Sequence, residues 1–497
     1  MGVVVRQGIK GSIVSYGGTL LGYLNIIILF PLILSTEQIG LYKVLIDAAG
    51  FFIIFAQLGM SNISIKFFPY FQNKEKQHNG FLFVTIIVPF IGFILFSLLM
   101  WGFKDELLLR FSEKSPLLLE YDHFLIPLSF TMLFLVILAT YSRSLLRIVV
   151  PKFLREILIR LIITIGAILY YFEIIDFSEF IACMVGGYGL ALISIIGYLK
   201  SLKQWFVRPQ LSFIDKKLGK KMGLFGLFML LGTGGGVIVG KIDTLMLSSL
   251  EGLNQTGIYS IAFYIAAVME LPRRVLAEIA TPLISSAFKN ENKAKVLEVY
   301  QKTSLNMLLI GGLCFIGIWA NIDSIFQLIP NSKAFEAGKI VVFIIGIAKL
   351  FDMSMGLNAE IITNSNYYKW NIFLMPFLAV VAIGTNLLFI PLYGITGAAI
   401  ATFISIISYN IIRYVLVLIK LNIQPFTTNT LKAIIAILTG WGIHLLIPSF
   451  EFFILDIIVR SITITAAFGA VVLYLKPSET IDEILDAFLK KIGIRKS

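Results

Sequence analysis

Ionisable side chains stand inside stretches of the chain that are otherwise apolar enough to cross a membrane. Lys43 and Asp47 are four residues apart, so one face of a helix would carry both. Lys241 and Asp243 stand two residues apart in another of these stretches. A lone ion at the middle of a bilayer costs at least about 2.5–3.5 kcal/mol. We therefore expect each of these groups to face a polar cavity or an opposite charge.

A third group of charges stands in one apolar stretch, 257–281. Glu270 is three residues from Arg273 and four from Arg274, so all three side chains can meet on one helix face. The arginines are near the end of this stretch, where long cationic side chains can reach the interface.

The stretch 337–361 contains the most deeply placed cation of the chain. Lys349 stands about midway along it, with Asp352 three residues further on and Glu360 two turns beyond that. Neutral hydrogen-bonding side chains at membrane depth are Asn25, Asn306, Asn358 and Asn386.

Two kinds of chemistry are open to these residues. Cations could hold an anionic headgroup; the candidates are Lys43, Lys241, Arg273, Arg274 and Lys349. Carboxylates could carry a coupling H⁺ or Na⁺, or simply neutralise the cations; the candidates are Asp47, Asp243, Glu270, Asp352 and Glu360. The structural alternative is that the pairs only join helices to one another. The sequence leaves both readings open.

The sequence contains no recognisable catalytic constellation. His78, His123 and His444 are scattered, and neither a nucleophile elbow nor a zinc-type spacing occurs. The run 235–241 resembles a phosphate-binding loop, but Ile242 stands where the Mg²⁺-binding hydroxyl should follow. We expect no enzyme activity, no metal and no cofactor.

The elements that must position these residues are membrane-spanning helices. The chain of 497 residues is 58% hydrophobic and 14% charged, with a mean hydropathy of +0.90. About 20 apolar residues cross a bilayer as a helix. We predict an all-α, multi-pass membrane protein with fourteen spans at 9–33, 38–60, 81–103, 117–140, 156–173, 178–199, 222–249, 257–281, 303–321, 337–361, 371–390, 394–418, 430–448 and 453–475.

The basic residues predict which loops face the cytoplasm. One alternate set of connecting segments, which includes both termini, holds 26 of the 41 lysines and arginines, whereas the other set holds 4. By the positive-inside rule the first set is cytoplasmic, so both termini face the cytosol. The net charge of +12 is therefore a topology signal, and we expect no nucleic-acid partner.

The chain also shows signs of an internal duplication. The hydropathy pattern repeats at an offset of about 217 residues, and the turn 37–42 (EQIGLY) is matched by 254–259 (NQTGIY). This offset spans six helices, an even number, so both halves insert in the same direction and form a parallel pseudo-repeat. We predict a six-helix bundle at 1–208, a second at 209–420, and two further helices with a cytoplasmic tail at 421–497.

Short motifs in this order resemble a known superfamily. They are Ile39-Gly40-Leu41-Tyr42 followed by Ala56-Gln57-Leu58-Gly59-Met60-Ser61; Asp243-Thr244-Leu245-Met246-Leu247 followed by Thr256-Gly257-Ile258-Tyr259; and Tyr393-Gly394-Ile395-Thr396-Gly397-Ala398-Ala399 followed by Ala401-Thr402. With six plus six plus two helices, the chain resembles the multidrug/oligosaccharidyl-lipid/polysaccharide exporter superfamily. Within it, the bacterial polysaccharide and O-antigen flippase branch is the most similar.

This resemblance implies a flippase of the bacterial inner membrane. Its cargo would be a polyprenyl-diphosphate-linked oligosaccharide, moved by alternating access for surface polysaccharide such as lipopolysaccharide O-antigen, capsule or exopolysaccharide. Membrane lipid surrounds such a protein, and a polysaccharide polymerase and glycosyltransferases are candidate partners. The alternatives are a cation-coupled drug or metabolite antiporter, a lipid-linked peptidoglycan precursor flippase, and a membrane glycan polymerase or ligase. The short outer loops disfavour the last of these.

Overall fold

The computed structural model describes residues 2–448 and 450–478, which form helices and connecting loops without any strand. The chain divides into two compact units. Unit 1 covers the chain up to Ser260 together with Met375–Ile383, and unit 2 covers Ile261–Leu374 and the chain from Gly384 onward. The predicted boundaries at 208/209 and 420/421 separate repeats of the sequence, whereas the two units are separated by their packing. These boundaries therefore stay a prediction. Most of the predicted cytoplasmic tail lies outside the described residues.

Unit 1 contains twelve complete α-helices, the first part of a thirteenth and the helical stretch Met375–Ile383 among its described residues. These thirteen helices are α1 (Gly2–Tyr23), α2 (Phe30–Ile33), α3 (Thr36–Ala56), α4 (Met60–Phe71), α5 (Phe81–Gly102), α6 (Lys104–Ser112), α7 (Pro116–Tyr121), α8 (Leu125–Ser144), α9 (Val149–Phe153), α10 (Ile159–Tyr171), α11 (Phe177–Ser201), α12 (Lys216–Leu250) and α13 (Leu253–Ala267). One-turn π-helices join α1 to α2 at Leu24–Leu29 and α9 to α10 at Leu154–Leu158.

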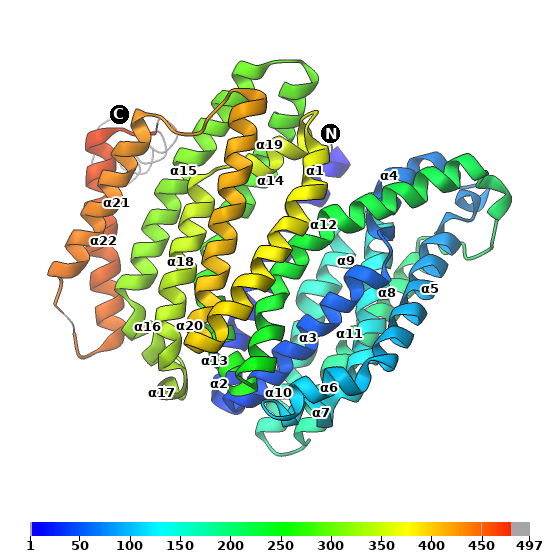
Figure 1. The fold of residues 1–497 in the computed structure, drawn as a ribbon, viewed down its shortest axis with the longest axis horizontal. Helices are drawn as coiled ribbons and strands as arrows, with labels where there is room; N and C mark the ends of the chain where they lie inside the picture. Colours follow the sequence, from blue (N-terminus) through cyan, green and yellow to red (C-terminus); the bar gives the residue numbers. More distant parts are fainter. Residues whose placement is uncertain (1, 449, 479–497) are drawn as a thin grey trace. The chain divides into compact units, whose positions relative to one another are not determined.

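Unit 2 is built from the end of α13 and from the helices that follow, except for Met375–Ile383, which belong to unit 1. The helices after α13 are α14 (Glu270–Lys289), α15 (Lys293–Ala320), α16 (Ile322–Leu328), α17 (Ser332–Phe335), α18 (Lys339–Ser354), α19 (Asn358–Asn364), α20 (Asn371–Leu421), α21 (Thr428–Leu446) and α22 (Phe453–Leu475). Helix α15 packs against α14, α18 and α21, and α21 packs against α22. Figure 1 shows these last two helices side by side.

Local sequence explains where several of these helices begin. Ser35 and Gln38 form a capping box at the start of α3, because each side chain accepts a hydrogen bond from the other residue's backbone N–H. Asp176 and Glu179 do the same for α11. Asp215 accepts from the backbone N–H of Leu218 and begins α12.

The longest helix, α20, covers two of the predicted spans. Its 51 residues would measure about 75 Å if straight, against a hydrocarbon core of about 30 Å. Gly394 interrupts it with φ 55° and ψ −129°, a conformation that residues with a Cβ rarely adopt. The predicted break between 390 and 394 therefore lies at this glycine.

The apolar composition of the helices agrees with a membrane protein. Among the described residues, nine helices are long and apolar enough to cross a bilayer, or ten if the bent pair Ser332–Ser354 and Asn358–Asn364 is one span. Because α20 counts once but covers two predicted spans, the helices found in this way give ten or eleven candidate crossings among the described residues. The exact number of fourteen stays a prediction. Large apolar side chains such as Phe373 and Val380 of α20 are mostly exposed, as expected for a lipid-facing surface.

Candidate functional site

Unit 1 contains a buried ion-pair cluster centred on Asp47, here called the Asp47 cluster. Lys43, one turn earlier on α3, forms an ion pair with Asp47 Oδ2. Lys241 of α12 approaches from the neighbouring helix, with its Nζ 2.8 Å from Asp47 Oδ1. The carboxylate is almost completely buried, whereas about a fifth of each lysine side chain is exposed. One carboxylate therefore holds two cations, and the cluster carries one excess positive charge.

The glycine at position 50 makes room for this contact. A Cβ on Gly50 of α3 would collide with the outer carbons and the Nζ of Lys241. Asp243, the other carboxylate predicted on α12, is buried and accepts a hydrogen bond of 3.2 Å from the Tyr259 hydroxyl of α13. Asp243 therefore has a neutral partner in this group of helices, and Lys241 pairs with Asp47.

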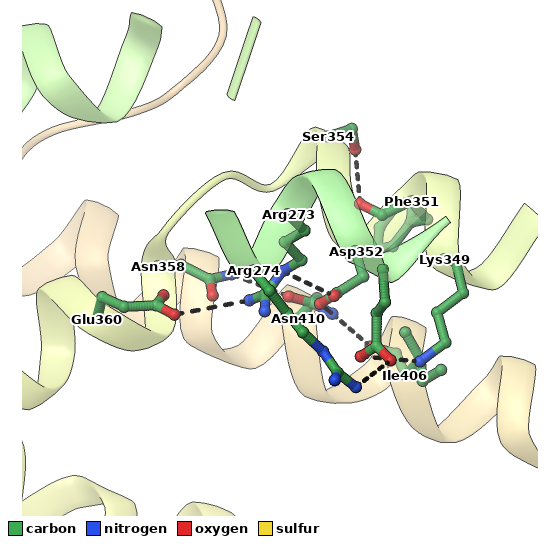
Figure 2. Close-up of polar contacts among 11 residues, drawn as sticks. Arg273, Arg274, Lys349, Phe351, Asp352, Ser354, Asn358, Glu360, Ile406 and Asn410 are labelled. Carbon is green, nitrogen blue, oxygen red and sulfur yellow. Dashed lines mark hydrogen bonds and ion pairs between the residues drawn. The ribbon is translucent and has the colours of Figure 1, made fainter. Parts of the chain in front are cut away.

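Unit 2 contains a larger group of charges on α14, α18, α19 and α20, here called the Arg273 cluster (Figure 2). Arg273 of α14 lies between two carboxylates. Its Nε is 3.2 Å from Asp352 Oδ2 on α18, and its Nη2 is 3.9 Å from Glu360 Oε1 on α19. Less than a fifth of the Arg273 side chain is exposed. One guanidinium thus joins three helices.

Lys349 pairs with a different carboxylate from the one nearest to it in sequence. Its Nζ lies 3.3 Å from Glu270 Oε1 of α14, and Arg274 Nη2 lies 3.3 Å from Glu270 Oε2. The Lys349 side chain is 13% exposed and that of Arg274 is 67% exposed. Lys349 is therefore the enclosed cation of this pair, and Arg274 is mostly accessible.

Two amides extend the cluster onto α20. Asn410 Nδ2 donates to Asp352 Oδ1 at 2.8 Å, and Asn358 Nδ2 donates to Asn410 Oδ1 at 3.0 Å. Both amides are buried. Asp352 is consequently held by Arg273 on one oxygen and by an amide on the other.

Arg413 adds a cation that sequence reasoning missed. It is one turn after Asn410, is only 8% exposed, and lies 3.7 Å from the centroid of the Tyr409 ring while donating to the Tyr409 hydroxyl. Its Nε has no hydrogen-bond partner among the described residues. The charges of Arg273, Arg274, Lys349 and Arg413 outnumber those of Glu270, Asp352 and Glu360 by one. The sequence did contain one indication of this cation: Asn410 and Arg413 are three residues apart, so one face of a helix carries both.

The remaining predicted amides lie apart from these clusters. Asn25 is buried, donates to the backbone carbonyl of Arg160 and accepts from Thr164. Asn306 accepts from Ser478 at 2.5 Å. Asn386 is fully buried on α20. Asn25 and Asn306 therefore join segments that are distant in sequence, while Asn358 belongs to the Arg273 cluster.

Another buried ion pair, on α22, was not predicted. Arg460 Nε lies 2.8 Å from Asp456 Oδ1, and Ser324 of α16 donates to Asp456 Oδ2 at 2.8 Å. His444 of α21 is 3.4 Å from Arg460 through its Nδ1. The charges of Arg460 and Asp456 cancel, so this pair adds no excess charge. Within residues 2–448 and 450–478, no three His, Cys, Asp or Glu side chains gather as metal ligands would.

The two repeated turns of the sequence meet in unit 1. Thr36 donates to the Asn254 side chain. A Cβ on Gly40 would collide with the backbone carbonyl of Leu253, and a Cβ on Gly257 would collide with that of Thr36. The start of α3 and the start of α13 therefore touch backbone to backbone, an approach that only glycine permits.

Comparison with solved structures shows which proteins share this fold. The fold is similar to "Lipid II flippase MurJ, inward closed conformation" with a TM-score of 0.69 and 16% identity, covering 94% of this chain and 99% of that one. It is also similar to an inward-facing multidrug resistance MATE transporter of the MOP superfamily (TM-score 0.62, 15% identity, 82% and 94% covered). A third similar structure is a point mutant of the Vibrio cholerae MATE transporter VcmN (TM-score 0.55, 12% identity, 85% and 98% covered). The protein has the fold of these membrane transporters.

The family follows from the sequence itself. Residues 5–288 match the family model described as "Polysaccharide biosynthesis protein". The chain belongs to this family, within the multidrug/oligosaccharidyl-lipid/polysaccharide exporter superfamily that the motifs had indicated. Its family and structural neighbours are transporters and flippases, not enzymes. Comparison with curated proteins gives no match.

Proposed function

We propose that this protein is a flippase that moves a polyprenyl-diphosphate-linked oligosaccharide across the bacterial cytoplasmic membrane. The observation that supports this most strongly is the excess of cations in both charge clusters, in a chain of the polysaccharide biosynthesis family. A diphosphate and its sugars cannot cross hydrocarbon without help, while a polyprenyl tail is soluble in it. The protein then needs to shelter only the headgroup.

The cations are proposed to bind the diphosphate by exchanging partners. Lys349 is held by Glu270 at 3.3 Å, and Arg273 approaches Glu360 no closer than 3.9 Å. At Lys349 a diphosphate can replace the carboxylate without leaving a bare charge behind, because Glu270 keeps Arg274 as a partner. At Arg273 it would separate Glu360 from its ion-pair partner. Arg274 is the most accessible cation and would meet the headgroup first. Lys43 and Lys241 would serve in the same way in unit 1.

The carboxylates have a second proposed role. When the headgroup displaces Glu270, Asp352 or Glu360 from a cation, the freed carboxylate can take up H⁺ or Na⁺. Asp47 and Asp243 could do so in unit 1. Binding of cargo and of a coupling ion would then be linked through the same side chains. The amides of Asn358 and Asn410 would offer hydrogen bonds to sugar hydroxyls once Asp352 moves.

Two other cargoes fit the same fold. MATE transporters are multidrug exporters by name, and a cationic drug would need accessible carboxylates. In both clusters the carboxylates are already paired with cations, which favours an anionic cargo. One of the similar structures is a lipid II flippase by name, so a lipid-linked peptidoglycan precursor is the second candidate.

A transport assay in proteoliposomes tests the proposal. The purified protein is reconstituted with a fluorescent polyprenyl-diphosphate oligosaccharide, with lipid II, or with a cationic dye, and movement to the other leaflet or compartment is measured. We expect the oligosaccharide-lipid to move and Lys349→Ala to stop it. The matched control is Lys339→Ala, which removes the same residue type at the start of the same helix, where Lys339 pairs with Asp323 and Glu336. Movement of the dye alone would refute the proposal, and movement of lipid II alone would assign the second candidate.

The proposed location follows from the basic loops. We place the protein in the cytoplasmic membrane with both termini on the cytoplasmic side. This orientation puts the excess of lysine and arginine on the inner face. The lipid-linked cargo would be made there by glycosyltransferases, and a polymerase on the outer face would use it.

A further inference from the structure

Unit 1 has a second polar site, away from the Asp47 cluster. A pocket of about 740 Å³ opens where three helices end, α4 at Phe71, α8 at Ser144 and α11 at Ser201. This volume lies within the range of about 300–1,000 Å³ that small-ligand sites occupy. Its lining comes from 65–78, 144–147 and 202–204. All three belong to segments whose basic residues predict the cytoplasmic side.

The polar groups in this pocket are mainly donors. Lys74, Arg147, Gln72 and Gln204 line it, and no Asp or Glu is among the lining residues. Within the part of the chain that the structure describes, no ion pair joins Lys74 or Arg147 to a carboxylate. Two full positive charges and two amides thus share one concave surface without an anion.

His78 fixes the direction of one of these amides. The imidazole is 3% exposed, and its Nδ1 accepts from the backbone N–H of Asn73 at 3.1 Å. The neutral ring must then carry its proton on Nε2, which donates to Gln204 Oε1 at 2.7 Å. Because the Gln204 oxygen is used in this bond, its NH₂ group remains as a donor at the pocket wall.

The backbone around the pocket is held in place by tight helix ends. Gln77, His78 and Asn79 have φ of 53°, 50° and 48°, and Leu146 and Lys203 also have positive φ. The Arg147 N–H bonds to the Ser142 carbonyl, and the Gln204 N–H bonds to the Leu199 carbonyl, in the pattern of Schellman caps. These bonds satisfy carbonyls of the α8 and α11 ends, but the dipoles of α4, α8 and α11 still oppose an anion with about half a negative charge each, roughly one and a half in all. The two whole charges of Lys74 and Arg147 exceed this sum.

We propose that this pocket binds a phosphate-bearing anion, with the headgroup of an anionic phospholipid of the inner leaflet as the favoured source. Basic pockets between helix ends on the cytoplasmic side suit such headgroups. Exposed apolar side chains stand beside the donors: Ile65 is 46% exposed and Leu146 is 58% exposed. A phosphate among the donors with an acyl chain over these side chains fits a lipid better than a fully soluble metabolite. The site is independent of the flippase proposal.

Native mass spectrometry of the full chain in detergent tests the site, with phosphatidylglycerol and phosphatidylcholine at equal concentrations. We expect the wild type to retain phosphatidylglycerol preferentially. The double variant Lys74→Gln/Arg147→Gln should weaken that binding by about twenty-fivefold, roughly fivefold for each cation. The matched control is Lys76→Gln/Arg143→Gln, which removes two exposed cations that do not line the pocket. It should retain the preference.

A third variant keeps the shape of the pocket and replaces one of its hydrogen-bond donors by a negatively charged acceptor. Gln204→Glu preserves the acceptor for His78 and replaces the free amide donor by a carboxylate oxygen, so it should abolish the preference. A parallel titration with glycerol 3-phosphate tells the sources apart: binding with the same variant dependence, without a preference for phosphatidylglycerol, would assign the site to a soluble phosphate. If the wild type binds neither probe, or the double variant behaves like its control, the proposal is wrong.

Discussion

Lys349 of α18 pairs with Glu270 of α14, at 3.3 Å from Nζ to Oε1, rather than with Asp352 one turn along its own helix. Asp352 has Arg273 and Asn410 as its partners instead. The pairing therefore runs between helices, and Lys349 and Arg273 both tie α14 to another element of unit 2. A change in the spacing of α14 and α18 would have to break or exchange these pairs.

The first prediction separates a binding role of Lys349 from a neutralising one. Lys349→Ala should abolish glycan export while the protein level in the membrane is retained, and Lys349→Arg should keep part of the activity. Truncating one partner of a buried pair also costs about 3–5 kcal/mol, because the other charge is left alone. The double variant Lys349→Gln/Glu270→Gln should regain stability, measured by thermal melting, without regaining export. Full export by the double variant would reduce Lys349 to a structural role.

A second prediction concerns the Asp47 cluster. Asp47→Asn leaves Lys43 and Lys241 close together with no counter-charge, so it should lower the free energy of unfolding by about 3–5 kcal/mol. Thermal melting in detergent measures this as a lower Tm. The control is Glu156→Gln, whose partner Arg160 is about a third exposed, so the loss there should stay below about 1 kcal/mol. Equal melting temperatures of the two variants would contradict the central position of Asp47.

The third prediction tests the contact between the repeated turns. Cysteines at Thr36 and Asn254, whose side chains are hydrogen-bonded, should cross-link readily with a short bifunctional reagent. If the starts of α3 and α13 must separate during transport, the cross-link should stop export, and reduction of a cleavable reagent should restore it. The single-cysteine variants treated in the same way serve as controls. Unimpaired export in the cross-linked protein would rule out a gate at this contact.

The fourth prediction concerns topology. Reporter fusions at Glu251 and Glu451 should read external, whereas fusions at Gln204, Asn290 and the C-terminus should read cytoplasmic, because the basic segments follow the positive-inside rule. Enzymatic reporters that fold on only one side of the membrane measure this directly. An external C-terminus would overturn the fourteen-span topology.

The sequence was sufficient for the helices and the family, because both depend on local patterns. Runs of about 20 apolar residues and the motifs around Gly40, Gly257 and Gly394 can be read without knowing any contact between helices. The i, i+4 pairs Lys43–Asp47 and Glu270–Arg274 also follow from helix geometry alone, and the structure contains both.

The contacts between helices could not be predicted from the sequence. Nothing local indicates that Asp47 reaches Lys241, 194 residues away, or that Arg273 reaches Asp352 and Glu360. Arg413 was missed for a related reason. It stands five residues from the end of its predicted span, where arginine often extends to the interface, yet the side chain turns inward onto Tyr409. Which way a long side chain turns depends on neighbours that hydropathy does not reveal.

The joint formed at Gly40 and Gly257 has a kinetic consequence. Where two helices pack through interdigitated side chains, separating them exposes the gaps between those side chains. Packing them together again requires each side chain to return to its native rotamer. At the two glycines of this joint main chain meets main chain, so fewer side-chain rotamers have to be set before the surfaces meet. Bulk added at either glycine would slow each cycle as well as loosen the closed form.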